Sequence, residues 1–360
     1  MSLSVSIRHR LASLDINVNF ESTGRLTALF GPSGCGKTTV INVIAGLLRP
    51  AEARIALDGD VFVDAASGRW TPPHLRRIGY VFQDARLLPH LTVQQNLRYG
   101  RWFTAASARY VDEAAVVELL GLSSLLARRP AHLPGGGRQR VAIGRAPLQS
   151  PRLLLMDEPL ASLDDARKHE ILPYVERLRD ELKIPVVYVS HVLGEVTRLA
   201  SDIILMSKGH VISAGPVRDV LPTLAAASGE LAQEAGSLID ATVRAYDSDD
   251  GLTTLASPLG ELRLAGAVGT PGKALRIHIR APDVMLATTP PSGVSALNVF
   301  QGTVAAIAEG DGASVDVRMA VGAAVVSARI TRFSARRLAL AQGKTVYAVV
   351  KAMSVRPPGA

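Results

Sequence analysis

The chain has 360 residues, of which 48% are hydrophobic, 20% charged and 4% aromatic, so it can bury more than one core and is too apolar for disorder over most of its length. Its 40 lysines and arginines exceed its 32 acidic residues by 40 − 32 = 8, a charge that suits nucleic acid, an anionic membrane surface or an anionic small ligand without choosing among them. The single cysteine, Cys35, excludes an intramolecular disulfide and favours a reducing compartment such as the cytoplasm.

The N-terminal segment lacks the apolar core of a signal peptide, because charged residues interrupt it at Arg8, Arg10, Asp15 and Glu21. Elsewhere no uninterrupted apolar run approaches the ~20 residues of a membrane-spanning helix. We therefore expect a chain that does not cross a membrane by itself.

Residues 1 to about 230 alternate short apolar runs with longer helix-like patterns, which predicts an α/β domain around a buried sheet. The clearest predicted strands are Leu26–Phe30, Leu153–Asp157 and Val186–Ser190. Ligands of open α/β sheets bind at the carboxyl ends of the strands. The functional residues are therefore expected just after these three runs.

The first of these strands leads into a phosphate-binding motif, because residues 31–38 read GPSGCGKT, fit G-x-x-x-x-G-K-[ST] and precede the helix-like run Thr39–Leu48. Glycines let backbone N–H groups approach phosphate, Lys37 can neutralise the β and γ oxygens, and the Thr38 hydroxyl can coordinate Mg²⁺. An ordinary glycine-rich turn would not require the whole motif between a strand and a helix. The residues expected to bind the nucleotide are Gly31, Pro32, Ser33, Gly34, Cys35, Gly36, Lys37, Thr38 and Thr39.

Polar residues also follow two further apolar runs. Gln83 follows Gly79–Phe82 and could reach Mg²⁺ or a water, and His191 follows Val186–Ser190 and could contact the γ-phosphate. Either residue alone also fits an ordinary core or surface position. Their parallel placement with the other strand-end motifs favours a functional role, and we assign both to the catalytic residues.

The strand Leu153–Asp157 is followed by a second carboxylate, Glu158. Apolar burial would not select two acids at this place. Asp157 is expected to hold Mg²⁺ together with Thr38 and Gln83, while Glu158 would polarise a water for in-line attack on the γ-phosphate. Capping of the next helix would explain one acid and leave the other without a role.

After Gly229 the sequence changes to β-branched residues that alternate with Gly, Pro and Asp turns, which predicts an all-β region. Residues 272–284 parallel residues 343–355 and suggest an internal repeat. Two similar small barrels joined by the Pro-rich segment Thr288–Gly293 are one interpretation. Two unrelated β-meanders that share a Gly-Lys turn are the other.

The order of these motifs resembles the ATP-binding subunits of ABC transporters over residues 1 to about 225. The matching segments are Gly31–Thr38, Gln83, Leu133–Arg140, Asp157, Glu158, Ser162–Asp164 and His191. The resemblance implies an α/β P-loop ATPase domain with a helical signature subdomain over residues 1–230, using ATP and Mg²⁺. It also implies a homodimer in which the signature of one subunit closes on the ATP of the other, and it adds Gly135, Gly136 and Asp164 to the nucleotide-binding residues.

Residues 79–90 and 96–100 resemble the branch of this family that energises molybdate import. Residues 295–300, 328–331 and 351–355 are similar to a small barrel that binds molybdate or tungstate. The resemblance therefore implies an all-β OB-like barrel domain over residues 231–360, with a core at about 292–356. Ser295, Lys351 and Ser354 would bind the oxyanion; the alternative is a dimerisation barrel with Lys351 solvated.

The sequence departs from the family pattern in its signature segment. Pro134 replaces a serine and removes a hydroxyl and an N–H, and Gly137 replaces a Glu or Gln and should weaken the helix by roughly 0.5–1 kcal/mol. Pro147 replaces a leucine and would cost about 3 kcal/mol in a helix interior. We expect weakened hydrolysis rather than a dead site. The adenine platform also differs, because Ile7–Leu11 offers only His9 or an arginine for stacking.

By this resemblance the partners would be two transmembrane permease subunits and, indirectly, a periplasmic or extracellular oxyanion-binding protein, at the cytoplasmic face of the inner membrane. Importers of sulfate, polyamines, iron or sugars use the same fold class. A third alternative is an oxyanion sensor with a vestigial ATPase. A soluble ABC-type ATPase acting on nucleic acid is disfavoured, because the chain lacks a long heptad segment before Asp157 and an aromatic-basic cluster, so no nucleic acid partner is expected.

Overall fold

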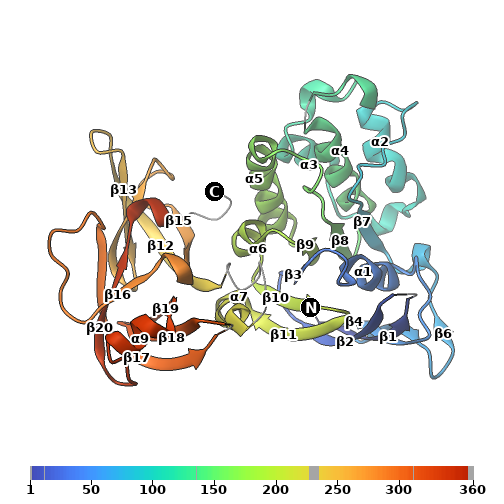
Figure 1. The fold of residues 1–360 in the computed structure, drawn as a ribbon. Coiled ribbons are helices and arrows are strands. Elements are labelled where there is room, and N and C mark those ends of the chain that lie inside the picture. Colours follow the sequence, from blue (N-terminus) through green and yellow to red (C-terminus); the bar gives the residue numbers. More distant parts are fainter. Residues whose placement is uncertain (1, 12, 135, 227–234, 311, 356–360) are drawn as a thin grey trace. The chain divides into compact units, whose positions relative to one another are not determined.

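The computed structural model describes residues 2–11, 13–134, 136–226, 235–310 and 312–355. The chain divides into two compact units, Met1–Pro216 and Val217–Ala360 (Figure 1). The domain boundary expected at residue 230 falls in 227–234, outside the described residues, and stays a prediction.

The described part of the first unit contains one eleven-stranded sheet in the order β6-β5-β4-β1-β2-β11-β10-β3-β9-β8-β7. Its strands are β1 (Leu3–Arg10), β2 (Asp15–Ser22), β3 (Leu26–Phe30), β4 (Glu52–Leu57), β5 (Asp60–Asp64), β6 (Arg69–Trp70), β7 (Ile78–Val81), β8 (Leu153–Asp157), β9 (Val186–Ser190), β10 (Asp202–Ser207) and β11 (His210–Pro216). The neighbours β10, β3, β9, β8 and β7 pair in parallel. Every residue of β3, β8 and β9 is buried, as expected of short apolar strands covered on both faces.

The α-helices of this unit are α1 (Lys37–Ala45), α2 (Val93–Tyr99), α3 (Glu113–Leu119), α4 (Gly137–Arg145), α5 (Asp165–Leu182) and α6 (Leu193–Leu199). Its 3₁₀ turns are η1 (Pro73–Leu75), η2 (Gly100–Phe103), η3 (Ala106–Ala108), η4 (Ser123–Leu125), η5 (Pro130–His132) and η6 (Pro147–Gln149). Figure 1 shows α2, α3 and α4 grouped together, away from β1 and β6. Within the described ranges, no helix combines the length and the apolar composition needed to span a bilayer.

The three strands predicted most clearly have the predicted bounds, whereas the helix expected over Thr39–Leu48 is shifted. It begins at Lys37 and ends at Ala45, because Gly46 adopts the left-handed conformation with a φ of 81°. The N–H of Gly46 then bonds the carbonyl of Val43, 3.1 Å away. The glycine, rather than the apolar pattern, sets the end of this helix.

The second unit contains two antiparallel sheets in its described part, ordered β14-β13-β12-β15 and β16-β20-β17-β18-β19. The strands are β12 (Gly236–Asp247), β13 (Leu252–Ser257), β14 (Gly260–Ala265), β15 (Ala274–Arg280), β16 (Met285–Ala287), β17 (Asn298–Glu309), β18 (Ser314–Val321), β19 (Ala324–Thr331) and β20 (Thr345–Val350). The helical segments are α7 (Val217–Val220), η7 (Leu221–Ala226), η8 (Ala281–Asp283), α9 (Arg332–Arg337) and η9 (Ala352–Ser354). The short helix α9 was not expected in an all-β region.

The internal repeat is visible in the strand order, because β17, β18, β19 and β20 connect as β12, β13, β14 and β15 do. Both first strands carry an irregularity, at Val243/Ala245 and at Val304/Ala306. The two small barrels, one interpretation of this repeat, are not independent of each other. The two sheets are open and pack around one shared hydrophobic core that runs from Ile239 to Val355.

Two equivalent hydrogen bonds join the repeats. Arg263 donates its backbone N–H to Oδ1 of Asn298 at 2.7 Å, and Ser327 donates its N–H to Oγ of Ser237 at 2.8 Å. Ser237 and Asn298 each lie five residues before the Thr-Val pair that marks their repeat. The first strand of each repeat therefore begins beside the third strand of the other repeat. Neither sheet closes into a barrel by itself for this reason.

Candidate nucleotide site

The loop between β3 and α1 is shaped by glycines. Gly34 and Gly36 have φ angles of 78° and 104°, in the left-handed region that favours glycine. A Cβ atom on Gly36 would lie 2.3 Å from Cδ1 of Ile16, so the end of that side chain would have to move to make room. Lys37 curls back and donates from Nζ to the carbonyl oxygens of Gly31 at 2.8 Å and Pro32 at 2.9 Å.

Asp157, at the end of β8, has a hydroxyl beside each of its carboxylate oxygens. Thr38 donates from Oγ1 to Oδ1 at 3.0 Å, and the Tyr80 hydroxyl lies 3.3 Å from Oδ2. The residue is 6% exposed, and burial raises the pKa of its carboxyl, an effect that both hydrogen bonds oppose. The pair of Thr38 and Asp157 presents the hard oxygen atoms that Mg²⁺ prefers.

Glu158 lies between a lysine and a histidine. Its Oε1 is 3.7 Å from Nζ of Lys37, and its Oε2 is 3.0 Å from Nδ1 of His191. The backbone of Glu158 has a φ of 43°, a conformation that costs free energy for a residue with a side chain and is frequent at functional sites. The carboxylate is thus aimed at the phosphate loop by the turn that follows β8.

The structure brings together five of the residues expected to act on the nucleotide, and their positions follow from the parallel sheet. Lys37 and Thr38 follow β3, Asp157 and Glu158 end and follow β8, and His191 follows β9. Because β3, β9 and β8 are adjacent and parallel, these side chains meet at one edge. Their chemical roles stay predictions.

Other expected site residues lie apart. Gln83 is exposed, two residues beyond the end of β7, and in the described chain neither it nor Asp164 bonds to the five converging residues. Asp164 instead caps α5 by accepting the N–H of Arg167 at 2.9 Å. Gly136 is left-handed, with a φ of 72°, whereas Gly135 lies outside the described residues.

The residue proposed for adenine stacking, His9, is half-buried in β1. Its Nδ1 is buried and makes no hydrogen bond to any described residue. The neighbouring arginines are exposed and face acids, with Arg8 3.8 Å from Glu52 and Arg10 3.5 Å from Asp15. A role of these residues toward adenine stays a prediction.

Glu195 is a buried acid that the sequence pattern did not single out. It is 4% exposed, and its Oε2 accepts hydrogen bonds from Tyr188 and Ser190, both at 2.8 Å. Burial raises the pKa of its carboxyl, and the two hydrogen bonds oppose that rise. Because Ser190 precedes His191, this acid fixes the turn that carries the histidine. The sequence signal that could have indicated Glu195 is an acidic residue on the apolar face of α6.

Comparison with known proteins agrees with this geometry. The ABC transporter family matches residues 14–161, and the TOBE domain family matches residues 294–357. Molybdenum import ATP-binding protein ModC of Mesorhizobium japonicum is 54% identical over 98% of this chain and 96% of its own. The chain belongs to the ABC transporter ATP-binding family. The Rhizobium meliloti protein of the same name is 50% identical over 99% of both chains.

Two solved structures share the fold of this ABC protein. A dimeric bacterial ABC transporter cassette has a TM-score of 0.50 and 25% identity, over 60% of this chain and 99% of its own. A dimeric ATP-binding cassette in a post-hydrolysis state with ADP and Pi has a TM-score of 0.50 and 28% identity, over 61% and 99%. The expected α/β P-loop ATPase domain followed by an all-β OB-like domain is confirmed, and the β domain has the form of a curled antiparallel half-barrel.

The signature segment of this ABC protein tolerates its unusual residues. Pro134 is exposed and its carbonyl accepts the N–H of Gly137 at 3.0 Å. A Cβ on Gly137 would lie 3.4 Å from Leu133 and Pro134 atoms, an ordinary contact distance, so a Cβ atom would fit. Pro147 is not inside α4, which ends at Arg145, and it instead begins η6. The cost expected for an interior proline therefore does not arise.

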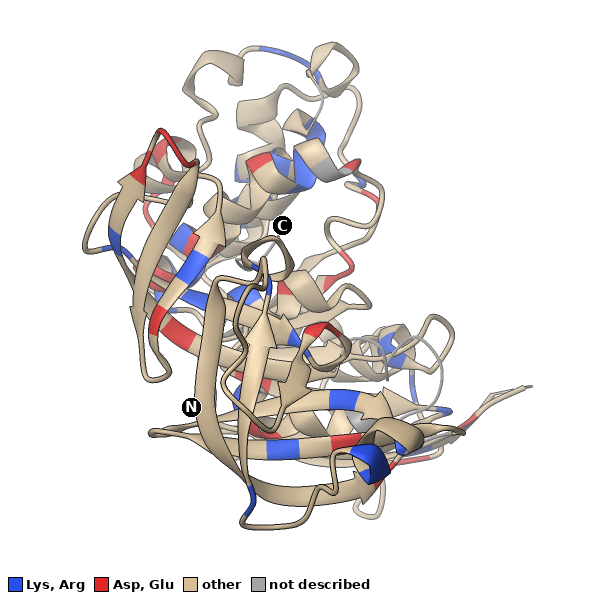
Figure 2. Cartoon of the chain, turned by 60° about the vertical axis from the view of Figure 1, so that its left-hand side comes forward, with Lys and Arg blue, Asp and Glu red and all other residues tan. Residues whose placement is uncertain are grey.

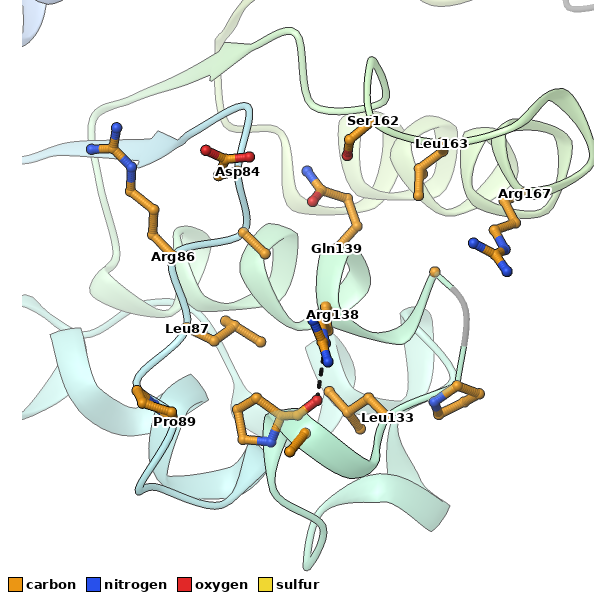
Figure 3. A pocket seen from close by; sticks show the side chains of 15 residues that line it. Asp84, Arg86, Leu87, Pro89, Leu133, Arg138, Gln139, Ser162, Leu163 and Arg167 are labelled. Atoms are coloured by element: carbon orange, nitrogen blue, oxygen red, sulfur yellow. Dashed lines mark hydrogen bonds between the residues drawn. The ribbon is translucent and has the colours of Figure 1, made fainter.

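A pocket of about 700 Å³ separates the segment after Gln83 from the signature segment (Figure 3). Asp84, Arg86 and Leu87 line one side, and Arg138, Gln139 and Leu133 line another. Ser162, Leu163 and Arg167 close it, and Arg138 donates to the carbonyl of Pro130 at 3.0 Å. Part of the segment Gln83–His90 thus borders an open cavity.

In the second unit, Lys351 follows β20 and is exposed, and Ser354 lies in η9, where its N–H bonds the Lys351 carbonyl at 3.0 Å. Ser295 is exposed and precedes β17, whose Asn298 pairs with Val350, so the two segments run side by side. At the equivalent place in the first repeat, Arg280 and Asp283 form a bidentate ion pair at 2.8 and 3.1 Å. The second repeat has a lysine and a serine where the first has a closed ion pair.

Proposed function

We propose that this chain is the ATP-hydrolysing subunit that energises the import of molybdate, or a related oxyanion, through a membrane ABC transporter. The observation that carries the proposal is the convergence of Lys37, Thr38, Asp157, Glu158 and His191, with the closest joining distances between 3.0 and 3.7 Å. The relatives are named molybdenum import ATP-binding proteins, which supports the choice of substrate.

ATP and Mg²⁺ fit the residues present. The Lys37 ammonium is bonded to neutral carbonyl oxygens of its own loop, which phosphate oxygens of an anion could replace favourably. Thr38 and Asp157 would hold Mg²⁺, with Gln83 completing the set, and the bound ion would neutralise developing charge on the phosphates.

Glu158 would act as the base toward the attacking water, because its carboxylate lies next to the phosphate loop. His191 would hold Glu158 through Nδ1 and leave Nε2 to face the γ-phosphate. Glycines of the phosphate loop would supply N–H groups to the β-phosphate. The two dimeric neighbours support a homodimer in which Gly135, Gly136 and Asp164 of one subunit complete the site of the other.

The chain would work under two transmembrane permease subunits at the cytoplasmic face of the inner membrane, supplied by an oxyanion-binding protein outside. Gln83–His90 would form much of the docking surface. In the second unit, Ser295, Lys351 and Ser354 offer hydroxyl and ammonium donors suited to molybdate or tungstate. The ion pair of Arg280 with Asp283 argues against a second such site in the first repeat.

Two alternative functions belong to classes other than transport. An oxyanion sensor with weakened ATPase activity is favoured by Pro134 and Gly137, and turnover in the assembled transporter would distinguish it. Against a nucleic-acid ATPase, Figure 2 shows lysines and arginines interspersed with acidic residues over both units. A nucleic-acid surface would gather the basic residues on one face.

Uptake of molybdate into proteoliposomes tests the proposal directly. The chain, its permease subunits and the external binding protein are reconstituted, with ATP on the side of this chain. ATP-dependent uptake of molybdate, lost in Lys37→Ala, supports the proposal. Equal or faster uptake of sulfate with its own binding protein would reassign the substrate, and no ATP-dependent uptake of either would reject the transport function.

A further inference from the structure

The strand before Gln83 places a tyrosine against the acid that would hold Mg²⁺. The hydroxyl of Tyr80 lies 3.3 Å from Oδ2 of Asp157, on the opposite carboxylate oxygen from the Thr38 bond. Asp157 is 6% exposed, and a buried carboxylate without donors is costly. Tyr80 belongs to no nucleotide-binding motif, yet its hydroxyl donates a hydrogen bond to one of the two carboxylate oxygens of Asp157.

The Tyr80 hydroxyl has one proton and two nearby acceptor atoms, because Oδ1 of Asn42 on α1 is 3.0 Å away. The carboxylate is the stronger acceptor of that proton. A 180° turn of the Asn42 amide would place Nδ2 toward Tyr80 and give one continuous chain of donors from Asn42 through Tyr80 to Asp157.

The Tyr80 ring is held from the other side. It stacks on Phe82 with ring centroids 4.2 Å apart and an interplanar angle of 29°. The Arg86 guanidinium lies 4.2 Å from the Phe82 ring, and the Arg86 carbonyl accepts a hydrogen bond from Arg145 at 2.9 Å. Arg86 also lines the pocket of Figure 3. These contacts leave the tyrosine little freedom to turn away from Asp157.

We propose that Tyr80 is a positioning residue for Asp157: its hydroxyl fixes one carboxylate oxygen so that the other is presented, together with Thr38, to Mg²⁺. The inference rests on the proposed function, since it takes Asp157 as the residue that holds the ion. It predicts that removal of the Tyr80 hydroxyl, which is not itself expected to contact the nucleotide, weakens Mg²⁺-dependent ATP binding. ATP binding without the metal should be preserved.

The test measures ATP binding by titration calorimetry in the Glu158→Gln protein, which should bind without turnover. Binding is followed against Mg²⁺ concentration and, separately, with excess chelator. Tyr80→Phe should raise the Mg²⁺ concentration needed for half-maximal enhancement of ATP binding about tenfold. Loss of a hydrogen bond to a residue that holds a metal ion typically weakens metal affinity by a factor of this order. Phe82→Leu, which keeps the hydroxyl but removes the stack, should raise it by a smaller factor.

Tyr110→Phe is the matched control, because its hydroxyl donates to the Pro151 carbonyl, away from the five site residues. It should leave the Mg²⁺ midpoint unchanged. An unchanged midpoint in Tyr80→Phe overturns the inference, and so does an equal loss of binding with the chelator, which would indicate a general structural role. Absence of Mg²⁺-enhanced ATP binding in the parent protein would instead contradict the proposed function itself.

Discussion

Nδ1 of His191 lies 3.0 Å from Oε2 of Glu158, although the two residues are 33 positions apart and come from different strands. The side chain of the glutamate is 15% exposed and that of the histidine 42% exposed. The acid is therefore sheltered and the imidazole is open to an incoming phosphate. Under the proposed function, this arrangement would divide water activation and phosphate contact between the ends of two strands.

Glu158→Gln should keep ATP binding near the wild-type level and lower turnover by ~10²–10⁴-fold, because it removes the base and keeps the size of the side chain. Lys37→Ala should weaken nucleotide binding itself, since its ammonium lies against the carbonyl oxygens of the phosphate loop. ATP binding and phosphate release are measured on the same preparations.

Glu176→Gln is the control for this pair of variants, because Glu176 pairs with Arg198 on the helices and not with the site. It should leave turnover unchanged. Wild-type turnover in Glu158→Gln would refute the assigned base.

The double variant Pro134→Ser with Gly137→Glu should raise ATP turnover about fivefold, the change that one recovered hydrogen bond of ~1 kcal/mol produces. The structure accepts a Cβ atom at Gly137, where it would meet neighbours at 3.4 Å. A glutamate in the first turn of α4 would also complement the helix dipole.

Gly137→Ala separates the two effects, because it improves the helix without adding a donor. It should raise the melting temperature and leave turnover near the wild-type value. If the double variant gains no activity, the cost assigned to the signature residues is wrong.

The pKa of Glu195 is raised, so its contribution to stability is complete below the usual glutamate value of 4.5 and is lost as the pH rises through the higher folded-state pKa. Glu195→Gln resembles the protonated acid and should flatten this dependence. The melting temperature of both proteins is measured from pH 4 upward, over a range of about 4 pH units. Parallel curves for the two proteins would show that Glu195 does not titrate in this range.

The sequence was sufficient for β3, β8 and β9 because a five-residue apolar run buried on both faces is a local signal. The glycine-lysine motif also predicts the loop after β3, whereas the bounds of the following helix differ from the expected Thr39–Leu48. Tyr80 could not be found in this way, since its partner Asp157 lies 77 positions away and only the pairing of β7 with β8 brings them together. The shared core of the two repeats was missed for the same reason: the bond between Arg263 and Asn298 spans 35 positions.

In the second unit, Lys351 is the only charged member of the expected oxyanion site. If this unit binds molybdate, Lys351→Ala should lower the affinity of the whole chain for molybdate by about 10- to 150-fold, because an ammonium contact to an anion contributes ~1.5–3 kcal/mol. Lys273→Ala is the control, an exposed lysine of the first repeat that should leave binding unchanged. Calorimetric titration of the full chain measures both.

Binding alone does not make the unit a sensor, because a ligand with equal affinity for two dimer states shifts neither population. A sensor that holds the ATPase dimer in an unproductive state must lower ATP turnover of the intact transporter as molybdate rises on the cytoplasmic side, with a midpoint near the measured dissociation constant. Lys351→Ala should move that midpoint upward by the same factor as it moves the affinity. Turnover that stays flat well above the dissociation constant would leave the unit with binding or dimerisation only, and would exclude regulation through Lys351.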